Sequence, residues 1–386
     1  MEVTSAMLQP APATVAFCLL SYRPDHPSGI ERSIAALIEG LRQLGHTPLI
    51  LAAGPAQDGD DAEPGLIRLE SVRLPRPAIN KDVLDALANP AAVRAEVQEV
   101  LQRHHVDAAC WGDTLWGLGY LGAAPPGTRT ALMVHKIRPA GEERWLQALK
   151  AADVVCPASD YLLEEAIAAG RDTSNWHVVL NALLMPPAPP PIGERQRLRS
   201  QGPIRIVSRA EPEKGLPQLL EAMPATWSRP VELVLAEADF EFWPGMQTEV
   251  MDACRQAAAR RPDVITLLPA LGWRQVPAFL GQAAATIISS IEPETFCFTA
   301  AEALSAGTPV ITHDIGNVPL LAGPAGRCVP LEQGAAALWE ATANLLDDDD
   351  AYLQASQAAC DRITRYTAKA SARALLDAVL PDLHRR

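Results

Sequence analysis

The sequence predicts an α/β protein of two Rossmann-like domains, each built on a doubly wound parallel sheet. Short apolar runs alternate with amphipathic helical segments in both halves of the 386-residue chain, as in parallel sheets covered by helices. Between the halves, residues 185–193 have the sequence MPPAPPPIG, and such a stiff proline-rich stretch is typical of a domain boundary. Each half is long enough to bury a core of its own.

The first half opens with a strand–helix–strand unit. The apolar run 14–20 predicts a buried strand, and Ser28 and Glu31 have the spacing of a capping box that begins an amphipathic helix. A second strand at 48–52 follows closely, so we expect a right-handed crossover between parallel strands. The backbone N–H groups at Gly29 and the next residue are a candidate phosphate cradle.

The same alternation continues to the proline-rich boundary. The predicted segments are a polar helix over 80–104, strands at 106–110, 130–134 and 153–156, and helices at 144–150 and 159–170. His135 follows one of these strands directly, and open parallel sheets bind ligands at that edge, so His135 is a candidate site residue. Asp58 and Asp60 lie in a polar loop that is more typical of an ordinary connector than of a metal site.

Two tryptophans flank a carboxylate after the strand at 106–110. Aromatic faces beside Asp113 suit a hydroxylated or aminated ring, which makes Trp111, Asp113 and Trp116 candidate ligand-binding residues. The alternative for either tryptophan is a core position around a tight turn.

The second half restarts the pattern with a strand at 204–208. Arg209 and Lys214 follow it near the carboxyl edge of the predicted sheet. Two cations beside a helix N-terminus are suited to a diphosphate leaving group, although either alone would be an ordinary surface charge.

The segment 291–310 carries the remaining candidates. A strand-like run leads to Glu294, and a helix that ends near Gly307 carries Glu302. If Thr299 caps this helix, its free N–H groups form an anion site beside Glu294, which would accept from a sugar hydroxyl while Glu302 takes both hydroxyls of a ribose. The alternative is that Thr299 and Glu302 form a capping box and Glu294 is a solvated loop charge.

Taken together, these motifs resemble the retaining family 4 glycosyltransferases with the GT-B fold, over nearly the full chain. The motifs are Glu294 and Glu302 with seven residues between them, AGTPV at 306–310, Arg209 with the Glu213-Lys214-Gly215 run, SGIER at 28–32, and His135 at a strand end. The resemblance implies two Rossmann-like domains that face each other across a cleft. It places the acceptor in the N-terminal domain, where Trp111, Asp113 and Trp116 become the candidate acceptor-binding residues, and the nucleotide sugar in the C-terminal domain.

The resemblance also implies residue roles. Its catalytic group consists of Arg209 and Lys214 on the diphosphate, His135 near the reacting carbon and Glu294 on the donor sugar. Its donor-binding group consists of Glu302 on the ribose, Gly29 on the phosphates, backbone contacts from Phe296, Cys297 and Phe298, and the helix start at Thr299. The family usually requires no metal, so we expect no cofactor besides the donor substrate.

Some positions depart from the family pattern. They are Ser28 in place of a first glycine, Lys136 after the histidine, Ala182 after Asn181, and Leu320 in place of a glutamate. The diphosphate and ribose positions match, so the departures bear on donor-sugar and acceptor preference. The domain boundaries that we predict are 1–185 for the N-terminal domain, 186–200 for the linker, 201–365 for the C-terminal domain and 366–386 for a helix that packs back toward the N-terminal domain.

Composition limits the partners. The net charge of -13 disfavours nucleic acid and anionic membranes, and no apolar run approaches the ~18 residues of a membrane helix. The first thirteen residues lack the features of a signal peptide, and the seven cysteines lack CxxC spacing, so we expect a cytoplasmic protein with reduced thiols.

We therefore expect transfer of glucose or N-acetylglucosamine from a UDP-sugar to a small soluble acceptor. The texture of the chain and its SYRPDHPSGIER segment are similar to aminoglycoside-biosynthesis glycosyltransferases, which act on 2-deoxystreptamine. The alternatives are a GT-B-fold epimerase or phosphorylase, or a non-catalytic nucleotide-sugar-binding protein. A nicotinamide dehydrogenase is disfavoured because no GxGxxG motif follows a predicted strand.

Overall fold

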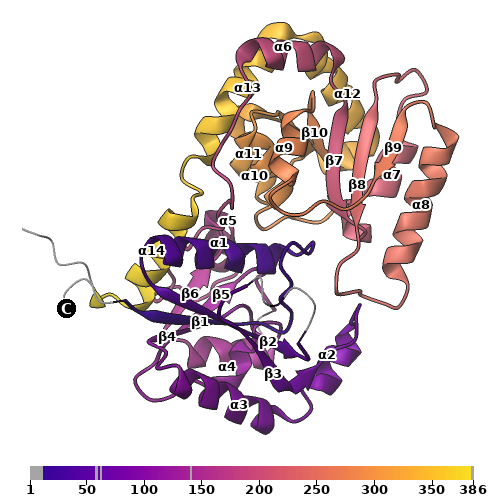
Figure 1. Cartoon of the computed structure of the whole chain (residues 1–386). Helices are drawn as coiled ribbons and strands as arrows, with labels where there is room; N and C mark the ends of the chain where they lie inside the picture. The colour runs from indigo at the N-terminus through magenta and orange to yellow at the C-terminus, as the bar shows by residue number, and fades with distance from the viewer. Residues whose placement is uncertain (1–11, 57–59, 61–62, 140, 384–386) are drawn as a thin grey trace, which may run out of the picture.

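The computed structural model describes residues 12–56, 60, 63–139 and 141–383, which form two α/β domains (Figure 1). The N-terminal domain contains one six-stranded parallel sheet in the order β3-β2-β1-β4-β5-β6. Its strands are β1 (Thr14–Cys18), β2 (Thr47–Gly54), β3 (Leu66–Arg73), β4 (Ala108–Trp111), β5 (Arg129–Val134) and β6 (Val154–Pro157). Its helices are α1 (Gly29–Gln43), α2 (Asn80–Ala86), α3 (Pro90–Arg103), α4 (Glu143–Ala151) and α5 (Asp160–Ala168).

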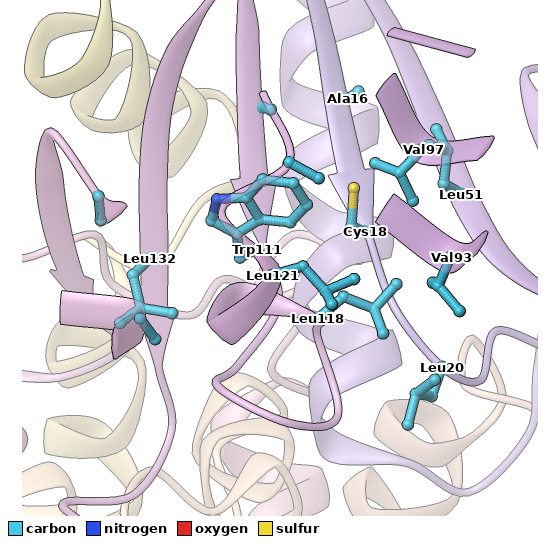
Figure 2. Packing of buried hydrophobic residues seen from close by; sticks show 14 of the residues in the cluster. Ala16, Cys18, Leu20, Leu51, Val93, Val97, Trp111, Leu118, Leu121 and Leu132 are labelled. Atoms are coloured by element: carbon cyan, nitrogen blue, oxygen red, sulfur yellow. The ribbon is translucent and has the colours of Figure 1, made fainter. Parts of the chain in front are cut away.

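Trp111 lies in the core of this domain rather than at a ligand site. It is the last residue of β4, a central strand that is buried on both faces, and its side chain is 0% exposed. Figure 2 shows the indole among Leu118, Leu121 and Leu132. The prediction that Trp111 contacts the acceptor is therefore wrong, because a strand covered by helices on both faces leaves its side chains no path to solvent.

The C-terminal domain repeats the architecture in two three-stranded parallel sheets, β7-β8-β9 and β10-β11-β12. A bridge between Ile204 and Ala285 joins them edge to edge, so the strands cross the domain in the order β9-β8-β7-β10-β11-β12. The strands are β7 (Ile204–Arg209), β8 (Val231–Ala236), β9 (Ile265–Leu268), β10 (Thr286–Ile288), β11 (Val310–His313) and β12 (Gly326–Val329). The helices of this domain are α6 (Ile192–Gln201), α7 (Leu216–Glu221), α8 (Met246–Arg260), α9 (Val276–Gly281), α10 (Phe298–Ser305), α11 (Val318–Ala322), α12 (Gly334–Asp347) and α13 (Asp349–Ile363). The chain then returns to the N-terminal domain in α14 (Ala368–Val379).

Helix α6 occupies much of the segment predicted as linker, 186–200. It packs against α13, and its buried Arg195 donates hydrogen bonds to the Gly281 carbonyl at 3.2 Å and the Tyr352 hydroxyl at 2.6 Å. The connection between the domains is therefore shorter than predicted, because Arg195 anchors α6 to the C-terminal domain.

The chain crosses between the domains twice, at neighbouring points. Leu183 N–H donates to the Tyr366 carbonyl at 2.9 Å, and Leu183 and Thr367 form a parallel bridge. Beyond the second crossing, α14 packs along α1 of the N-terminal domain (Figure 1). Gly40 permits this close approach, since a Cβ at that position would lie 2.0 Å from the Ala368 carbonyl oxygen.

We predict that Gly40→Ala destabilises the protein by roughly 1–3 kcal/mol, because the added methyl group must push α14 away from α1. The measurement is the urea midpoint of unfolding. The matched control is Gly193→Ala in α6, where a Cβ would meet no atom within 4 Å and where alanine should be neutral or slightly stabilising. Equal midpoints for Gly40→Ala and the wild type would show that α14 can move away from α1 without a loss of stability.

Candidate functional site

A cleft of about 940 Å³ lies between the domains, at the carboxyl ends of strands from both sheets. His135 follows β5 on one wall, and Arg209 ends β7 on the other. The carboxyl ends of parallel strands are where open α/β sheets bind ligands. The cleft is therefore the candidate site of the protein.

Glu294 and Lys214 form an ion pair on the C-terminal wall of this cleft. The Lys214 ammonium donates to Glu294 Oε1 at 2.7 Å, and the Ser290 hydroxyl donates to the same oxygen at 2.6 Å. Burial raises the pKa of Glu294, but the charge and hydrogen bond of Lys214, the Ser290 hydrogen bond and the charge of Arg209 together hold that pKa below its usual value. Glu294 is therefore an ionised hydrogen-bond acceptor beside two cations.

The backbone around Glu294 is held by a glycine with a left-handed conformation. Gly316 has φ +65°, and a Cβ there would lie 2.6 Å from the Glu294 nitrogen. The adjacent Asn317 N–H donates to the Glu294 carbonyl at 2.8 Å. This clamp fixes the loop that carries the Glu294 carboxylate.

Helix α10 begins beside Glu294 without a side-chain cap. Its N-cap is Cys297, which has φ +73°, while the Thr299 hydroxyl donates to the Val207 carbonyl at 3.2 Å. The expected Thr299 cap is therefore wrong, because the hydroxyl is used to attach α10 to β7. Phe296, Cys297, Phe298 and Thr299 all line the cleft. The first N–H groups of α10 remain available to an anion.

Glu302 does not line the cleft, because Arg32 of the N-terminal domain covers it. The Arg32 Nη1 atom lies 2.9 Å from Glu302 Oε1 and 2.8 Å from Oε2, and its guanidinium also stacks over Phe298 and Trp273. The alternative capping box is excluded too, since the carboxylate faces Arg32 rather than the start of α10. Burial raises the pKa of Glu302 to about 7, although Arg32 opposes this shift.

On the N-terminal wall, α1 begins at the cleft. The Ser28 hydroxyl accepts from Glu31 N–H at 3.4 Å, which confirms half of the predicted capping box. The Glu31 carboxylate does not return this contact, because it accepts from the Ser21 hydroxyl at 2.6 Å and from Arg23 N–H at 2.8 Å. A Cβ at Gly29 would meet no atom within 4 Å, so the backbone there is open to the cleft.

His135 and two of the three predicted acceptor residues line the same wall. Burial lowers the pKa of His135, with Asp113 opposing, and the His135 Nε2 atom has no hydrogen-bond partner. Asp113 accepts from Thr114 N–H and lies 3.5 Å from Arg138 Nη2. Trp116 also lines the cleft. This wall combines a neutral imidazole, a carboxylate and an aromatic ring.

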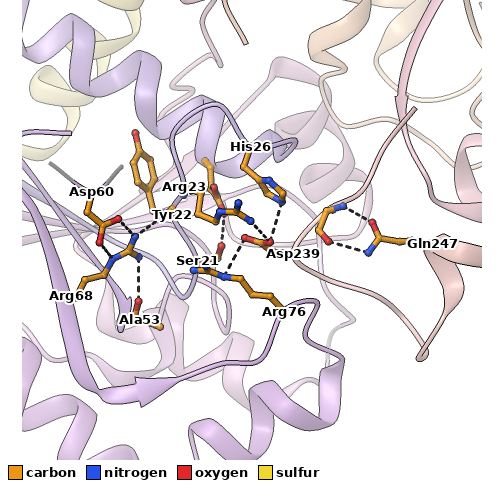
Figure 3. Close-up of polar contacts among 12 residues, drawn as sticks. Ser21, Tyr22, Arg23, His26, Ala53, Asp60, Arg68, Arg76, Asp239 and Gln247 are labelled. Atoms are coloured by element: carbon orange, nitrogen blue, oxygen red, sulfur yellow. Dashed lines mark hydrogen bonds and ion pairs between the residues drawn. The ribbon is translucent and has the colours of Figure 1, made fainter. Parts of the chain in front are cut away.

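Sequence reasoning missed a cluster that joins the two walls. The carboxylate of Asp239, just after β8, lies 2.8 Å from Arg23 Nη1, 3.1 Å from His26 Nε2 and 3.6 Å from Arg76 Nε (Figure 3). Two neighbouring residues, Phe240 and Phe242, line the cleft. The available signal was the apolar run VELVLA at 231–236, which has the length of a buried strand and directly precedes the EADFEFWPG segment, because strand ends face ligands.

The described residues contain no group of three or more histidine, cysteine or acidic side chains placed to hold a metal. Asp60 pairs with Arg68 (Figure 3), and Asp58 lies outside the described residues. All seven cysteines are free thiols. In the part of the chain that the structure describes, no helix has the length and apolarity to span a membrane.

Comparisons with known proteins agree with this geometry. Residues 27–183 match the family model "Glycosyltransferase Family 4", and residues 199–362 match the family model "Glycosyl transferases group 1". No curated protein shows a significant sequence match to the chain.

Several solved structures share the fold. A sucrose-phosphate synthase from Thermosynechococcus elongatus has a TM-score of 0.73 at 17% identity, covering 94% of this chain and 97% of its own. HepE from Anabaena in complex with UDP has a TM-score of 0.71 at 15% identity, with coverage of 95% and 98%. A glycosyltransferase from Rickettsia africae has a TM-score of 0.69 at 18% identity, with coverage of 97% and 99%. The predicted fold of two Rossmann-like domains is thus confirmed.

The raised pKa of Glu302 predicts a pH dependence of stability. The folded state binds this proton more tightly than the unfolded state, so its stabilising effect is complete below pH 4.5, the ordinary pKa of a glutamate, and is lost as the pH rises to about 7. The wild type should therefore lose up to about 3 kcal/mol from this group between pH 4.5 and pH 8. The measurement is the urea midpoint of unfolding of the wild type and of Glu302→Gln at each pH. Glutamine at this position does not titrate, so the difference between the two midpoints should change with pH by the amount that the wild type loses. A constant difference across this range would contradict the raised pKa.

Proposed function

The chain is a glycosyltransferase that consists of a Family 4 domain followed by a group 1 domain, and from this premise we propose that it moves a hexosyl group from a UDP-sugar to a small soluble acceptor. The observation that carries the proposal is the C-terminal wall of the cleft, where Arg209, Lys214 and Glu294 lie together beside the open start of α10. This arrangement pairs an anion site with an ionised acceptor for sugar hydroxyls.

The donor diphosphate would lie against Arg209, Lys214 and the first N–H groups of α10. These groups stabilise the negative charge that grows on the diphosphate as its bond to the sugar breaks, an effect of about a few kcal/mol per contact. Glu294 would accept from hydroxyls of the transferred hexose, which we take to be glucose or N-acetylglucosamine. UDP as the nucleotide is supported by the structurally similar HepE, which was solved with UDP.

We assign retention of anomeric configuration and no protein nucleophile. Glu294 is held by Lys214 and Ser290, and Asp113 lies beside Arg138, so neither carboxylate is presented alone to the reacting carbon. In the proposed step, the bond from the anomeric carbon to the diphosphate breaks and the acceptor oxygen bonds on the same face. The acceptor proton passes to the leaving diphosphate, and neutral His135 lies beside the sugar. No metal takes part in this scheme.

For the acceptor we propose a small cyclitol or sugar, with 2-deoxystreptamine of aminoglycoside assembly as the specific candidate, and we place the reaction in the cytoplasm. The net charge of -13 and the position of Asp113 and Trp116 in the cleft support a polar, partly cationic ring. Arg138 compensates part of the Asp113 charge, so attraction between charges contributes less than the sequence suggests.

Transfer can be tested by mass spectrometry of protein incubated in chelator with UDP-glucose or UDP-N-acetylglucosamine, with and without 2-deoxystreptamine. We expect UDP release and a product of acceptor plus hexosyl mass. Arg209→Ala should lower turnover roughly a hundredfold. The matched control is Arg197→Ala, whose guanidinium pairs with Glu194 on the surface of α6. Conversion of the UDP-sugar without acceptor would favour an epimerase or phosphorylase. Binding of the UDP-sugar without release of UDP would favour a non-catalytic nucleotide-sugar-binding protein.

Arg32 must leave Glu302 if that carboxylate is to hold the ribose. The single Nη1 atom bridges both carboxylate oxygens, which is also the position that two neighbouring ribose hydroxyls would take. Arg32 is then an internal competitor of the nucleoside, and its displacement lowers donor affinity.

We predict that Arg32→Gln binds UDP about tenfold more tightly, since a charge-assisted hydrogen bond no longer has to be broken. The measurement is titration calorimetry. The increase in affinity caused by Arg32→Gln should be smaller for 2′-deoxy-UDP, because this ligand offers Glu302 one hydroxyl fewer. The increase should vanish when Arg32→Gln is combined with Glu302→Gln. Weaker UDP binding by Arg32→Gln would instead show that Arg32 supports the donor directly.

A further inference from the structure

The loop after β8 is a rigid element that the donor domain presents to the acceptor side of the cleft. Buried Gln247 donates to the Ala238 carbonyl at 3.0 Å and accepts from Ala238 N–H (Figure 3). The Glu241 carboxylate accepts from the N–H groups of Gly245 and Gln247, both at 3.0 Å. Side chains on this loop are therefore held in place before any ligand binds.

The same loop is attached to the N-terminal domain through its backbone. Ala78 N–H donates to the Asp239 carbonyl at 2.8 Å, and Glu241 N–H donates to the Ala78 carbonyl at 2.9 Å. These bonds make a short parallel bridge between Ala78 and Phe240. Phe240 consequently lies where the two domains meet.

Alternate residues of the loop face the cleft. Phe240 and Phe242 line it, whereas Trp243 does not and instead bonds through its indole N–H to Glu249 at 3.2 Å. Phe240 stands edge to face with Trp116 of the other domain at 5.5 Å, and Phe242 stands edge to face with Phe240 at 5.7 Å. The three rings form one aromatic row across the domain boundary.

Polar atoms without partners lie on the same part of the cleft. Thr114 is 1% exposed, and its hydroxyl has no hydrogen-bond partner in the structure. It lies in the sequence between Asp113 and Trp116, the two predicted acceptor residues that line the cleft. His135 Nε2 is likewise buried and without a partner. Both residues line the cleft. Since buried polar groups are normally satisfied, these two atoms point to a ligand with hydroxyl groups.

We propose that Phe240 and Phe242 of the donor domain form the platform for the acceptor, and that the acceptor is a saturated, hydroxylated ring, either a saccharide or a cyclitol. The ring would place its apolar C–H face on the aromatic row and direct hydroxyls to Thr114 and Asp113. This inference rests on the proposed function and deepens it. It also makes acceptor recognition depend on both domains, since Trp116 comes from the N-terminal domain and Phe240 from the C-terminal domain.

The test is saturation-transfer NMR of 2-deoxystreptamine and of methyl β-D-glucoside with the full chain, with and without UDP, alongside calorimetric titration of UDP. Phe240→Ala and Phe242→Ala should each weaken binding of the ring probe at least tenfold while UDP affinity is unchanged. Trp243 is about as exposed as Phe242, at 43% against 47%, but does not line the cleft, so Trp243→Ala should match the wild type. Phe240→Trp should restore binding.

The outcomes separate this inference from the proposed function. Ring binding that is unchanged in both phenylalanine variants would overturn the platform while leaving transfer intact. Binding of UDP without binding of either ring probe would overturn the acceptor class and leave the donor assignment standing. If UDP fails to bind, the proposed function fails, and the ring probes without UDP still decide the platform through the same variants.

Discussion

The shape of the cleft depends on one largely buried carboxylate, that of Asp239, whose side chain is 11% exposed. A charged group removed from water is costly unless partners compensate it, and here all three basic partners come from the opposite domain. Burial raises the pKa of Asp239, but the His26 hydrogen bond and the charges of His26, Arg23 and Arg76 bring it below its usual value. The walls thus meet through charge compensation, and the backbone bridge of Ala78 places the aromatic loop beside them.

Local periodicity predicted the strand–helix alternation of each half, and the rule that ligands bind at strand ends selected His135, Arg209 and Lys214. The arrangement of two domains that face each other across a cleft came instead from the resemblance to a known family. The structure brings these three residues and Glu294 to one cleft. The ends of strands can be predicted because each one lies where a local apolar run stops in the sequence.

Contacts between domains could not be predicted in this way. Arg32 and Glu302 are 270 positions apart, and no local pattern reports that one covers the other. Thr299 is a residue type that often caps helices, but its hydroxyl donates a hydrogen bond to the Val207 carbonyl of β7 instead. Trp111 had an aromatic neighbourhood typical of a sugar site, yet it ends a strand buried on both faces. In each case tertiary packing overrode a correct local pattern.

The position of α14 has a consequence for how the protein is made. Leu375, Leu376 and Val379 of α14 belong to the same hydrophobic cluster as Ile34 and Leu41 of α1, although they follow the whole C-terminal domain in the sequence. Domains usually fold as soon as they have been synthesised, beginning with the N-terminal one. Here an apolar face of α1 stays uncovered until α14 has been translated, which happens only after the whole C-terminal domain has been synthesised. The core of the N-terminal domain is therefore completed only after the C-terminal domain has been synthesised, and until then the nascent chain exposes an apolar surface.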